Sequence, residues 1–210
     1  MMRILSFDCA TKTLGICLFS YNTNWEKDLN NAIEEKSWHK ICDVINNSLI
    51  VEYCECIDVA EIKDLDVVKA RNLKTALEQV PVYDDMIVLI EFQMGSNFKS
   101  RLIFHYLTYH YAHYELFIIP AMQKNTFEFT DMKLQDFTAK YASPYTANKK
   151  HSTQNFLYVV TLFELKGISL KGKLDDKADA FMQGLAFVRD RKKYLANPLI
   201  KGIVHKASKD

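Results

Sequence analysis

The sequence has few of the residues that form joints between domains. It contains only 6 glycines and 4 prolines among 210 residues. Flexible linkers and sharply bent loops are usually rich in these two residues. We therefore expect residues 1–210 to form one domain around one core, with 194–210 as a tail.

The sequence also lacks a disulfide framework and a membrane anchor. Its 5 cysteines are an odd number, and Cys54 and Cys56 form a C-x-C pair without the second half of a zinc site. Buried thiols in a reducing compartment are expected. No apolar run reaches the roughly 18 residues of a membrane span, and the N-terminal segment does not have the pattern of a secretory signal. These features favour a cytoplasmic protein without membrane contact.

A large excess of basic charge is missing as well. The formal net charge is +1, whereas domains that bind nucleic acid are often strongly basic. Two local clusters remain, the pair Lys149 and Lys150 and a basic group within 189–193. Each is compatible with nucleic-acid binding or with an ordinary solvated surface.

What the chain does contain is a regular series of apolar segments. The patterns predict strands over 2–8, 15–19, 50–59, 86–91 and 115–119, and helices over 64–79, 98–114, 131–141, 149–166 and 175–193. Strands come first, strands and helices then alternate, and helices end the chain, which is typical of a layered α/β domain. Residues 24–49 are polar with helix-like apolar spacing, and we interpret them as a possible insertion.

Four carboxylates occupy positions at which a site is expected. Asp8 and Glu91 end two predicted strands, and Asp176 and Asp179 share one face at the start of the last predicted helix. Sheets of α/β proteins usually bind ligands at the carboxyl ends of their strands. If the two strands are neighbours, the four carboxylates converge to within roughly 4–8 Å of one another, as a two-ion site requires.

Converging carboxylates repel one another and are tolerated when a cation lies among them. Ligand sets made only of oxygen select Mg²⁺ or Mn²⁺ over zinc. Two such ions about 4 Å apart can activate a water and stabilise the leaving oxygen of a phosphodiester. The spacing therefore suggests hydrolysis of phosphate esters.

Each acid also has a purely structural explanation. Asp176 can cap the last helix, with Asp179 favoured in the first turn by the helix dipole. Asp8 can be a turn former at the end of a strand. Glu91 is harder to explain in this way, because it follows five apolar residues in a strand expected to be buried, where an unpaired charge is costly.

Three motifs carry a resemblance to a known family. FDCATKTLGICL at 7–18 resembles the first hairpin of RuvC-type resolvases. IEFQMGSN at 90–97 resembles the strand-end I-E-x-Q motif of the fungal mitochondrial and poxviral branches, and KLDDKADAF at 173–181 is similar to their closing D-D-x-x-D-A signature. The motifs occur in the family's order and spacing across nearly the whole chain.

The resemblance implies an RNase H-like three-layer α/β fold, with a mixed five-stranded sheet flanked by helices. It places the family's four metal-binding and catalytic acids on Asp8, Glu91, Asp176 and Asp179, with two Mg²⁺ ions per site for which Mn²⁺ can substitute. It implies a homodimer that resolves four-way (Holliday) junctions or branched replicating DNA by paired symmetric nicks. A viral replication site in the host cytoplasm is then favoured over mitochondria.

Several further side chains are candidates for DNA contact. By resemblance, Lys124 matches a basic residue after the fifth strand, and Lys149 and Lys150 match the basic segment that opens the next helix. Cations at a helix start are disfavoured by the dipole, so such a pair points to an external anion. The remaining candidates lie beside the strand-end acids and are Thr11, Lys12, Phe92 and Gln93. His151 is a further candidate for a phosphate contact.

Alternatives from other classes remain open. An RNase H-like nuclease acting on flaps or RNA–DNA hybrids would need the same acids, and an inactive module would bind junctions without cutting. An ATPase of the actin or sugar-kinase type would need a longer chain. The 98–114 helix is apolar on more than one face, so its tyrosine-rich side either meets a two-fold mate or is covered within one subunit.

Overall fold

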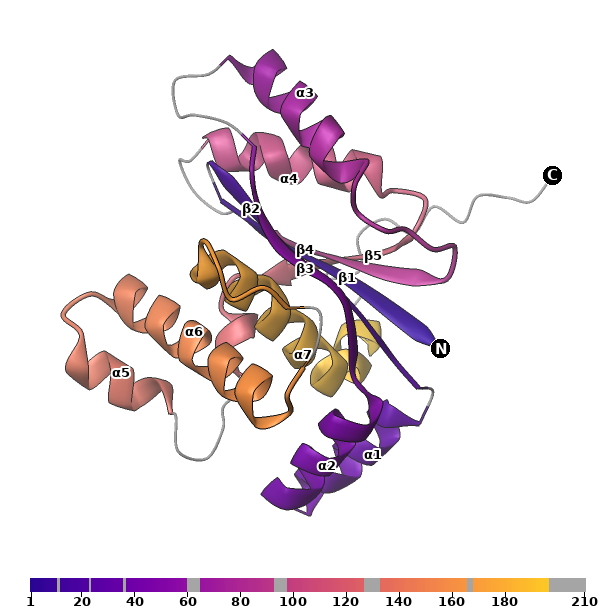
Figure 1. Cartoon of the computed structure of the whole chain (residues 1–210), viewed down its shortest axis with the longest axis vertical. Coiled ribbons are helices and arrows are strands. Elements are labelled where there is room, and N and C mark those ends of the chain that lie inside the picture. Colours follow the sequence, from indigo (N-terminus) through magenta and orange to yellow (C-terminus); the bar gives the residue numbers. More distant parts are fainter. Residues whose placement is uncertain are drawn as a thin grey trace.

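The structure is a computed structural model in which one mixed sheet carries helices on both faces (Figure 1). It describes residues 1–10, 12–22, 24–35, 37–59, 65–92, 98–126, 133–165 and 168–196. The five strands are β1 (Met2–Cys9), β2 (Thr13–Tyr21), β3 (Ile50–Asp58), β4 (Met86–Phe92) and β5 (Glu115–Pro120). No helix in these ranges is long and apolar enough to cross a lipid bilayer.

The strand order is β3-β2-β1-β4-β5. The first three strands in the chain form an antiparallel meander, while β4 pairs in parallel with both β1 and β5. A parallel pair needs a crossover, and helices supply it between β3 and β4 and between β4 and β5. The predicted mixed five-stranded sheet is therefore confirmed.

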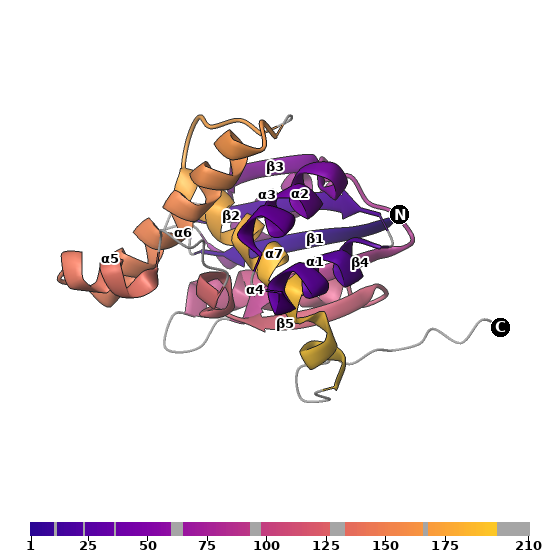
Figure 2. The same cartoon turned by 90° about the horizontal axis from the view of Figure 1, so that it is seen from below.

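Helices cover the sheet in two layers (Figures 1 and 2). One face packs against α3 (Asp66–Leu77) and α4 (Phe98–His110). The other face packs against α1 (Trp25–Glu34), α2 (Trp38–Ser48), α6 (Pro144–Leu162) and α7 (Leu174–Ala196). A short 3-10 helix, η1 (Gln123–Thr126), and α5 (Leu134–Lys140) connect β5 to α6.

The central strand β4 shows why both layers are needed. Its side chains alternate between the two cores, with Ile87 and Leu89 in the α7 core and Val88 and Ile90 in the α4 core. A strand covered on both faces has an unbroken apolar sequence, which is what MIVLI shows. Its β-branched residues also favour the extended backbone.

The helix α7 lies close against the sheet because small residues face it. Gly184 is one of them, and a Cβ atom there would lie 2.3 Å from the ring of Phe19 on β2. Three alanines of α7 are also fully buried, namely Ala178, Ala180 and Ala186. Small side chains shorten the distance between helix and sheet, which brings the first turn of α7 to the strand ends.

The prediction of a helix over 149–166 is wrong about its start, because α6 begins at Pro144. Proline suits a first helical position, since its φ is preset and its missing N–H needs no partner there. The segment 24–49 forms α1 and α2, whose Trp25, Leu29 and Ile45 are fully buried in the same core as α7.

Candidate active site

The strand register brings Asp8 and Glu91 to one face of the sheet. Phe7 of β1 pairs with Ile90 of β4, so the two acids are the next residues on adjacent parallel strands. Side chains alternate along a strand. Phe7 and Ile90 lie in the α4 core, so both acids point to the opposite face, where α7 lies.

The first two turns of α7 add the two remaining predicted acids. Asp176 and Asp179 are three residues apart, and both are almost completely buried. Gly15 on β2, which pairs with Asp8, makes this approach possible. A Cβ atom at Gly15 would lie 2.1 Å from the backbone carbonyl oxygen of Asp176.

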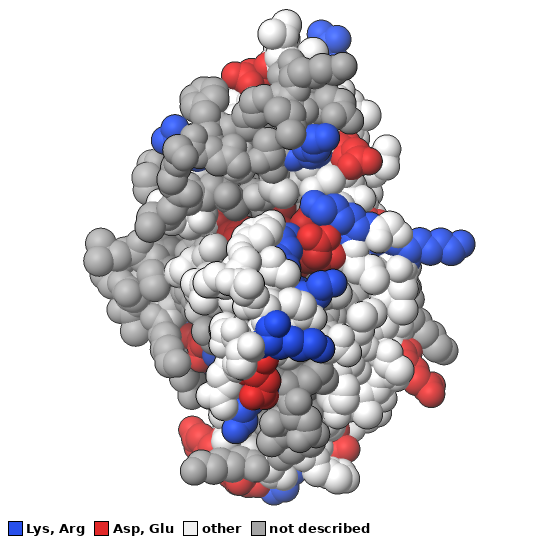
Figure 3. Space-filling view, turned by 90° about the vertical axis from the view of Figure 1, so that its left-hand side faces the viewer, with Lys and Arg blue, Asp and Glu red and all other residues white. Residues whose placement is uncertain are grey.

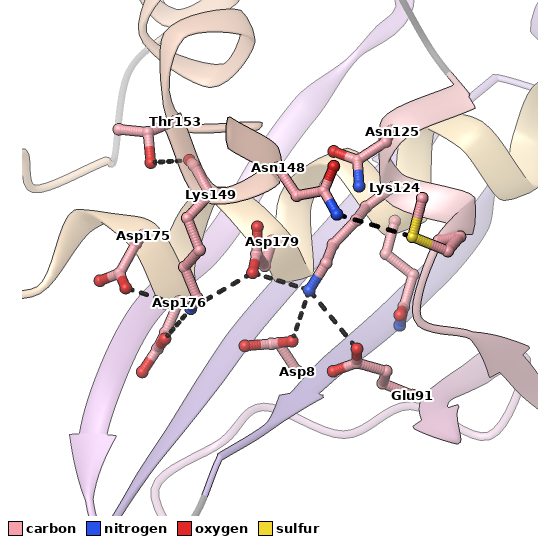
Figure 4. A network of polar contacts seen from close by, with 12 residues as sticks. Asp8, Glu91, Lys124, Asn125, Asn148, Lys149, Thr153, Asp175, Asp176 and Asp179 are labelled. Atoms are coloured by element: carbon pink, nitrogen blue, oxygen red, sulfur yellow. Dashed lines mark hydrogen bonds and ion pairs between the residues drawn. The ribbon is translucent and has the colours of Figure 1, made fainter. Parts of the chain in front are cut away.

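The ammonium group of Lys124, on η1, lies among three of the four acids (Figure 4). Its Nζ is 2.7 Å from Asp179 Oδ2, 3.0 Å from Asp8 Oδ1 and 3.4 Å from Glu91 Oε1. Because each oxygen lies within 3.4 Å of the same nitrogen, any two of them are separated by at most twice that distance. Three chain segments remote in sequence thus place their carboxylates around one point.

A second lysine joins Asp176 to this group. Lys149 Nζ, on α6, is 2.9 Å from Asp176 Oδ1, 3.1 Å from Asp175 Oδ2 and 3.4 Å from Asp179 Oδ2. Since α6 begins at Pro144, the expectation that Lys149 and Lys150 open their helix is wrong. The helix dipole therefore does not disfavour these two lysines, and acidic partners inside the protein explain the position of Lys149.

Burial and neighbouring charges shift the pKa values of Asp8, Asp179 and Lys124. Burial raises the pKa of Asp8 well above its usual range, although Lys124 opposes the shift. The pKa of Asp179 is raised for the same reason, again against Lys124. Burial lowers the pKa of Lys124, but the surrounding carboxylates outweigh it and keep that pKa well above its ordinary value. The raised pKa values show that the crowded carboxylates repel one another and are buried, a cost that a bound cation would reduce.

Asp176 has different partners and the opposite shift. Burial raises its pKa, but hydrogen bonds from Lys173 and Thr13 and the nearby Lys149 outweigh this, so its pKa lies below the ordinary value. Lys173 Nζ is 2.7 Å from Asp176 Oδ2 and 3.0 Å from Thr13 Oγ1, and Thr13 Oγ1 donates to the same carboxylate oxygen. Sequence reasoning missed both residues. Only the fold brings Thr13 to Asp176, whereas Lys173 lies three positions before Asp176 and could have been found from that spacing.

The other predicted DNA contacts lie at different depths. Lys12 and Lys150 are exposed, and Phe92 is 41% exposed with its ring 5.8 Å from that of Phe104. Thr11 and Gln93 lie outside the described residues. His151 is fully buried, which contradicts its interpretation as a phosphate contact.

The surface around the acids is mixed in charge. Figure 3 shows acidic side chains next to basic ones on the face that carries α5 and α6, and the described residues there form no continuous basic stripe. This pattern agrees with the small net charge of the chain. Binding of a polyanion here would depend on individual lysines and bound cations rather than on a broad basic field.

The donor set fits a hard divalent cation. In the described ranges no three acidic, histidine or cysteine side chains are arranged as a ready metal cage, since lysine ammonium groups lie between the carboxylates. All candidate ligands are carboxylate oxygens, the type that Mg²⁺ and Mn²⁺ prefer. Asp179 Oδ1 is buried and has no hydrogen-bond partner. Such an atom is costly unless something binds it.

The sheet order, its two helical layers and the acids at one sheet edge define the RNase H-like class of α/β folds. The family model described as Poxvirus A22 protein matches residues 2–191. The chain therefore belongs to the poxvirus A22 protein family.

Solved structures agree on the fold. The chain is similar to a Fowlpox virus resolvase in complex with substrate Holliday junction DNA, with 17% identity, a TM-score of 0.55, and coverage of 90% of this chain and 99% of that chain. It is also similar to Thermus thermophilus RuvC, with 13% identity, a TM-score of 0.52, and coverage of 90% and 96%. No curated protein matches the sequence.

Proposed function

We propose that this chain is a metal-dependent endonuclease that resolves four-way DNA junctions by paired symmetric nicks. The observation that carries the proposal is the group of four acids, Asp8, Glu91, Asp176 and Asp179, held around two lysines at one edge of the sheet. The family assignment and the likeness to a resolvase solved with Holliday junction DNA support the choice of substrate.

The four acids would hold two Mg²⁺ ions, or Mn²⁺ in their place. When bound, such ions activate water and stabilise the charge that develops on the leaving oxygen. Lys124 and Lys149 limit the repulsion between these acids and a phosphodiester, because each ammonium contacts at least three carboxylates. Thr13 and Lys173 orient Asp176 through its second oxygen.

The exposed Lys12 and Lys150 lie next to this machinery in the chain and suit contacts with the DNA backbone. Thr11 and Gln93 are proposed as further DNA contacts on the resemblance alone. Phe92, directly after Glu91, has enough exposed ring to contact a base. Replication of a poxvirus in the host cytoplasm would be the setting.

A two-fold dimer would match the near two-fold symmetry of a four-way junction. The inner side of α4 is buried through Ile103 and Leu107, whereas Tyr109 is 87% exposed. We propose that the outer side of α4 meets its mate, since tyrosine tolerates an interface with one wet edge. Light scattering at micromolar concentration should give twice the chain mass. A strict monomer that still makes paired, symmetric nicks would contradict the dimer.

Cleavage of end-labelled synthetic substrates tests the function. We expect the protein with Mg²⁺ to nick a four-way junction in two opposed strands, and EDTA to stop it. A flap, a linear duplex and an RNA–DNA hybrid of the same sequence serve as competing substrates. Faster cutting of the flap or the hybrid would identify an RNase H-like nuclease of another specificity. Tight junction binding with no cutting in Mg²⁺ or Mn²⁺ would identify an inactive binding module.

A further inference from the structure

Lys177 is a buried cation of α7, directly after Asp176 in the chain. Its side chain is only 3% exposed, and lysine is almost never buried to this extent unless it is paired. Its ammonium group contacts β3 and the turn before α7. We propose that Lys177 is a positioning residue, which sets the metal affinity of Asp176 by keeping Lys173 against it. The inference rests on the proposed function, in which Asp176 is a metal ligand.

The ammonium group of Lys177 uses all of its donors. Its Nζ donates to Glu55 Oε2 at 2.8 Å, to the backbone carbonyl of Ser169 at 3.0 Å and to that of Lys171 at 3.2 Å. An ammonium group has three N–H donors, so the set of partners is complete. Two of the three acceptors are carbonyls of the turn before α7. Burial of this charge is therefore tolerated only while the turn is in place.

The turn that Lys177 holds is otherwise exposed. Ser169 is half-buried, and residues 170–173 are exposed. The turn is closed locally by the backbone N–H of Lys171, which donates to Ser169 Oγ, 3.3 Å away. Gly172 has a φ of 80°, a left-handed conformation that glycine adopts without strain. Loss of the bonds from Lys177 would therefore release the turn from β3 and α7.

The turn ends in Lys173, which contacts Asp176 directly. Lys173 Nζ is 2.7 Å from Asp176 Oδ2 and 3.0 Å from Thr13 Oγ1. The Lys173 side chain is 46% exposed. A half-exposed lysine loses rotamer entropy in such a contact, so the contact depends on where the backbone holds the side chain. Lys177 fixes that backbone two residues earlier, at Lys171.

The contact with Lys173 influences how strongly Asp176 binds a cation. A divalent cation at this carboxylate would be repelled by the Lys173 ammonium group, because both carry positive charge. Lys173 therefore limits the metal affinity of Asp176 while it keeps the carboxylate in one orientation. Release of the turn should remove both effects, so that metal binds more tightly to a carboxylate that is less well oriented.

Binding of Mn²⁺ to the full chain without DNA tests this role. Free Mn²⁺ is measured by electron paramagnetic resonance, because the signal of the bound ion is broadened. We expect Lys173→Met to increase the apparent affinity about threefold, on the scale of a half-exposed ion pair. Lys177→Met keeps the apolar stem but loses the tether, so it should give a similar increase. General damage to the fold would instead weaken binding.

A double variant separates action through Lys173 from an independent effect. If Lys177 acts by placing Lys173, the two changes share one consequence. The combination of Lys173→Met and Lys177→Met should then bind Mn²⁺ as Lys173→Met does alone. Lys171→Met is the matched control, because it removes an exposed charge from the same turn and keeps the carbonyl that Lys177 uses. Its affinity for Mn²⁺ should equal that of wild type.

Gly172→Val disturbs the turn without changing any charge. A Cβ atom there would meet nothing within 4 Å, so the packing is kept. The left-handed φ is strained for a β-branched residue, so the backbone of the turn must change. We expect this variant also to bind Mn²⁺ more tightly than wild type. If Lys177→Met does not fold, an unchanged affinity of Gly172→Val would overturn the positioning role.

The other outcomes are distinguishable. Folded Lys177→Met protein that binds Mn²⁺ no more tightly than wild type would overturn the positioning role and leave the proposed function intact. Increases from Lys173→Met and Lys177→Met that add in full in the double variant would also overturn it. Wild-type protein that binds no Mn²⁺ and cuts no junction would contradict the proposed function itself.

Discussion

Gly15 lies directly against the backbone carbonyl of Asp176, with no room for a side chain between β2 and the first turn of α7. The Gly15→Ala change would place a Cβ atom 2.1 Å from that carbonyl oxygen, so α7 must move away from the sheet. We expect a loss of about 1–3 kcal/mol in the free energy of unfolding, as for other overpacked sites. Metal-dependent cleavage by the folded variant should also fall at least tenfold, because positioning errors near 1 Å are costly.

Gly184→Ala is the matched comparison. There the added Cβ would meet the ring of Phe19 rather than backbone, away from the acids. Denaturant titration should show a similar loss of stability, while cleavage by the folded fraction stays close to wild type. Equal losses of cleavage in both variants would mean that Gly15 has no special role beside Asp176.

Asp8→Asn should abolish cleavage but preserve junction binding. The change removes a proposed metal ligand while reducing the negative charge that a phosphate meets. Cleavage assays and gel-shift titrations with Mg²⁺ measure the two properties on the same junction. Asp43→Asn, which changes an exposed aspartate on α2, should leave both unchanged. Loss of binding by folded Asp8→Asn protein would mean that Asp8 positions DNA instead.

Lys150→Ala and Lys149→Ala should differ, although the residues are adjacent. Lys150 is exposed, and its removal should lower the slope of log affinity against log salt by about one, as for one lost phosphate contact. Lys149 contacts three aspartates, so its loss should change the Mg²⁺ concentration needed for half-maximal cleavage. Binding measured from low to moderate salt provides the slopes. An unchanged slope for Lys150→Ala would show that this lysine is an ordinary solvated residue.

Asp176 should stabilise the folded protein at neutral pH. Burial raises its pKa, but Lys173, Thr13 and Lys149 together lower the pKa by more than burial raises it. The folded pKa therefore lies below the unfolded value near 3.9. A depressed pKa gives stability that is present above the unfolded pKa and is lost as pH falls through the folded pKa. Asp176→Asn should therefore lower the midpoint of thermal unfolding at pH 7, and its difference from wild type should vanish in acid.

The pKa of Asp8 is shifted in the opposite direction to that of Asp176, so Asp8→Asn serves as a control. Burial raises its pKa, so its charged form costs stability, and this cost grows as pH rises above the unfolded value. In EDTA at pH 7, Asp8→Asn should unfold at a higher temperature than wild type. Adding Mg²⁺ should reduce that advantage. A lower midpoint for Asp8→Asn in EDTA would contradict the direction of this shift.

Local sequence patterns were enough to place the strands and the two strand-end acids. Glu91 stands out because a carboxylate directly follows five apolar residues of a strand that is buried on both faces. Strand alternation predicts the face of the sheet on which Glu91 lies. It does not predict the contact with Lys124, because Lys124 reaches the acids from η1 through the tertiary fold. The resemblance to resolvases, rather than any pattern of spacing, suggested Lys124.

What the patterns could not provide is contact between remote segments. Thr13 and Asp176 are 163 positions apart, and neither position has a periodic signal that points to the other. The sequence also does not predict the start of α6, because the polar residues after Pro144 hide the helical period. Lys149 and Lys150 therefore lie inside the helix and not at its start.

The order of the acids along the chain has a consequence for biosynthesis. Asp8 and Glu91 are synthesised before Asp176 and Asp179, which α7 adds after all five strands have been made. Domains begin to fold as their N-terminal parts are synthesised, at about 5–20 residues per second. A nascent or prematurely terminated chain therefore carries half of the ligand set and lacks α7 on the face that α1, α2 and α6 also cover. The ligand set of the proposed nuclease is therefore complete only after the last helix has packed against the sheet.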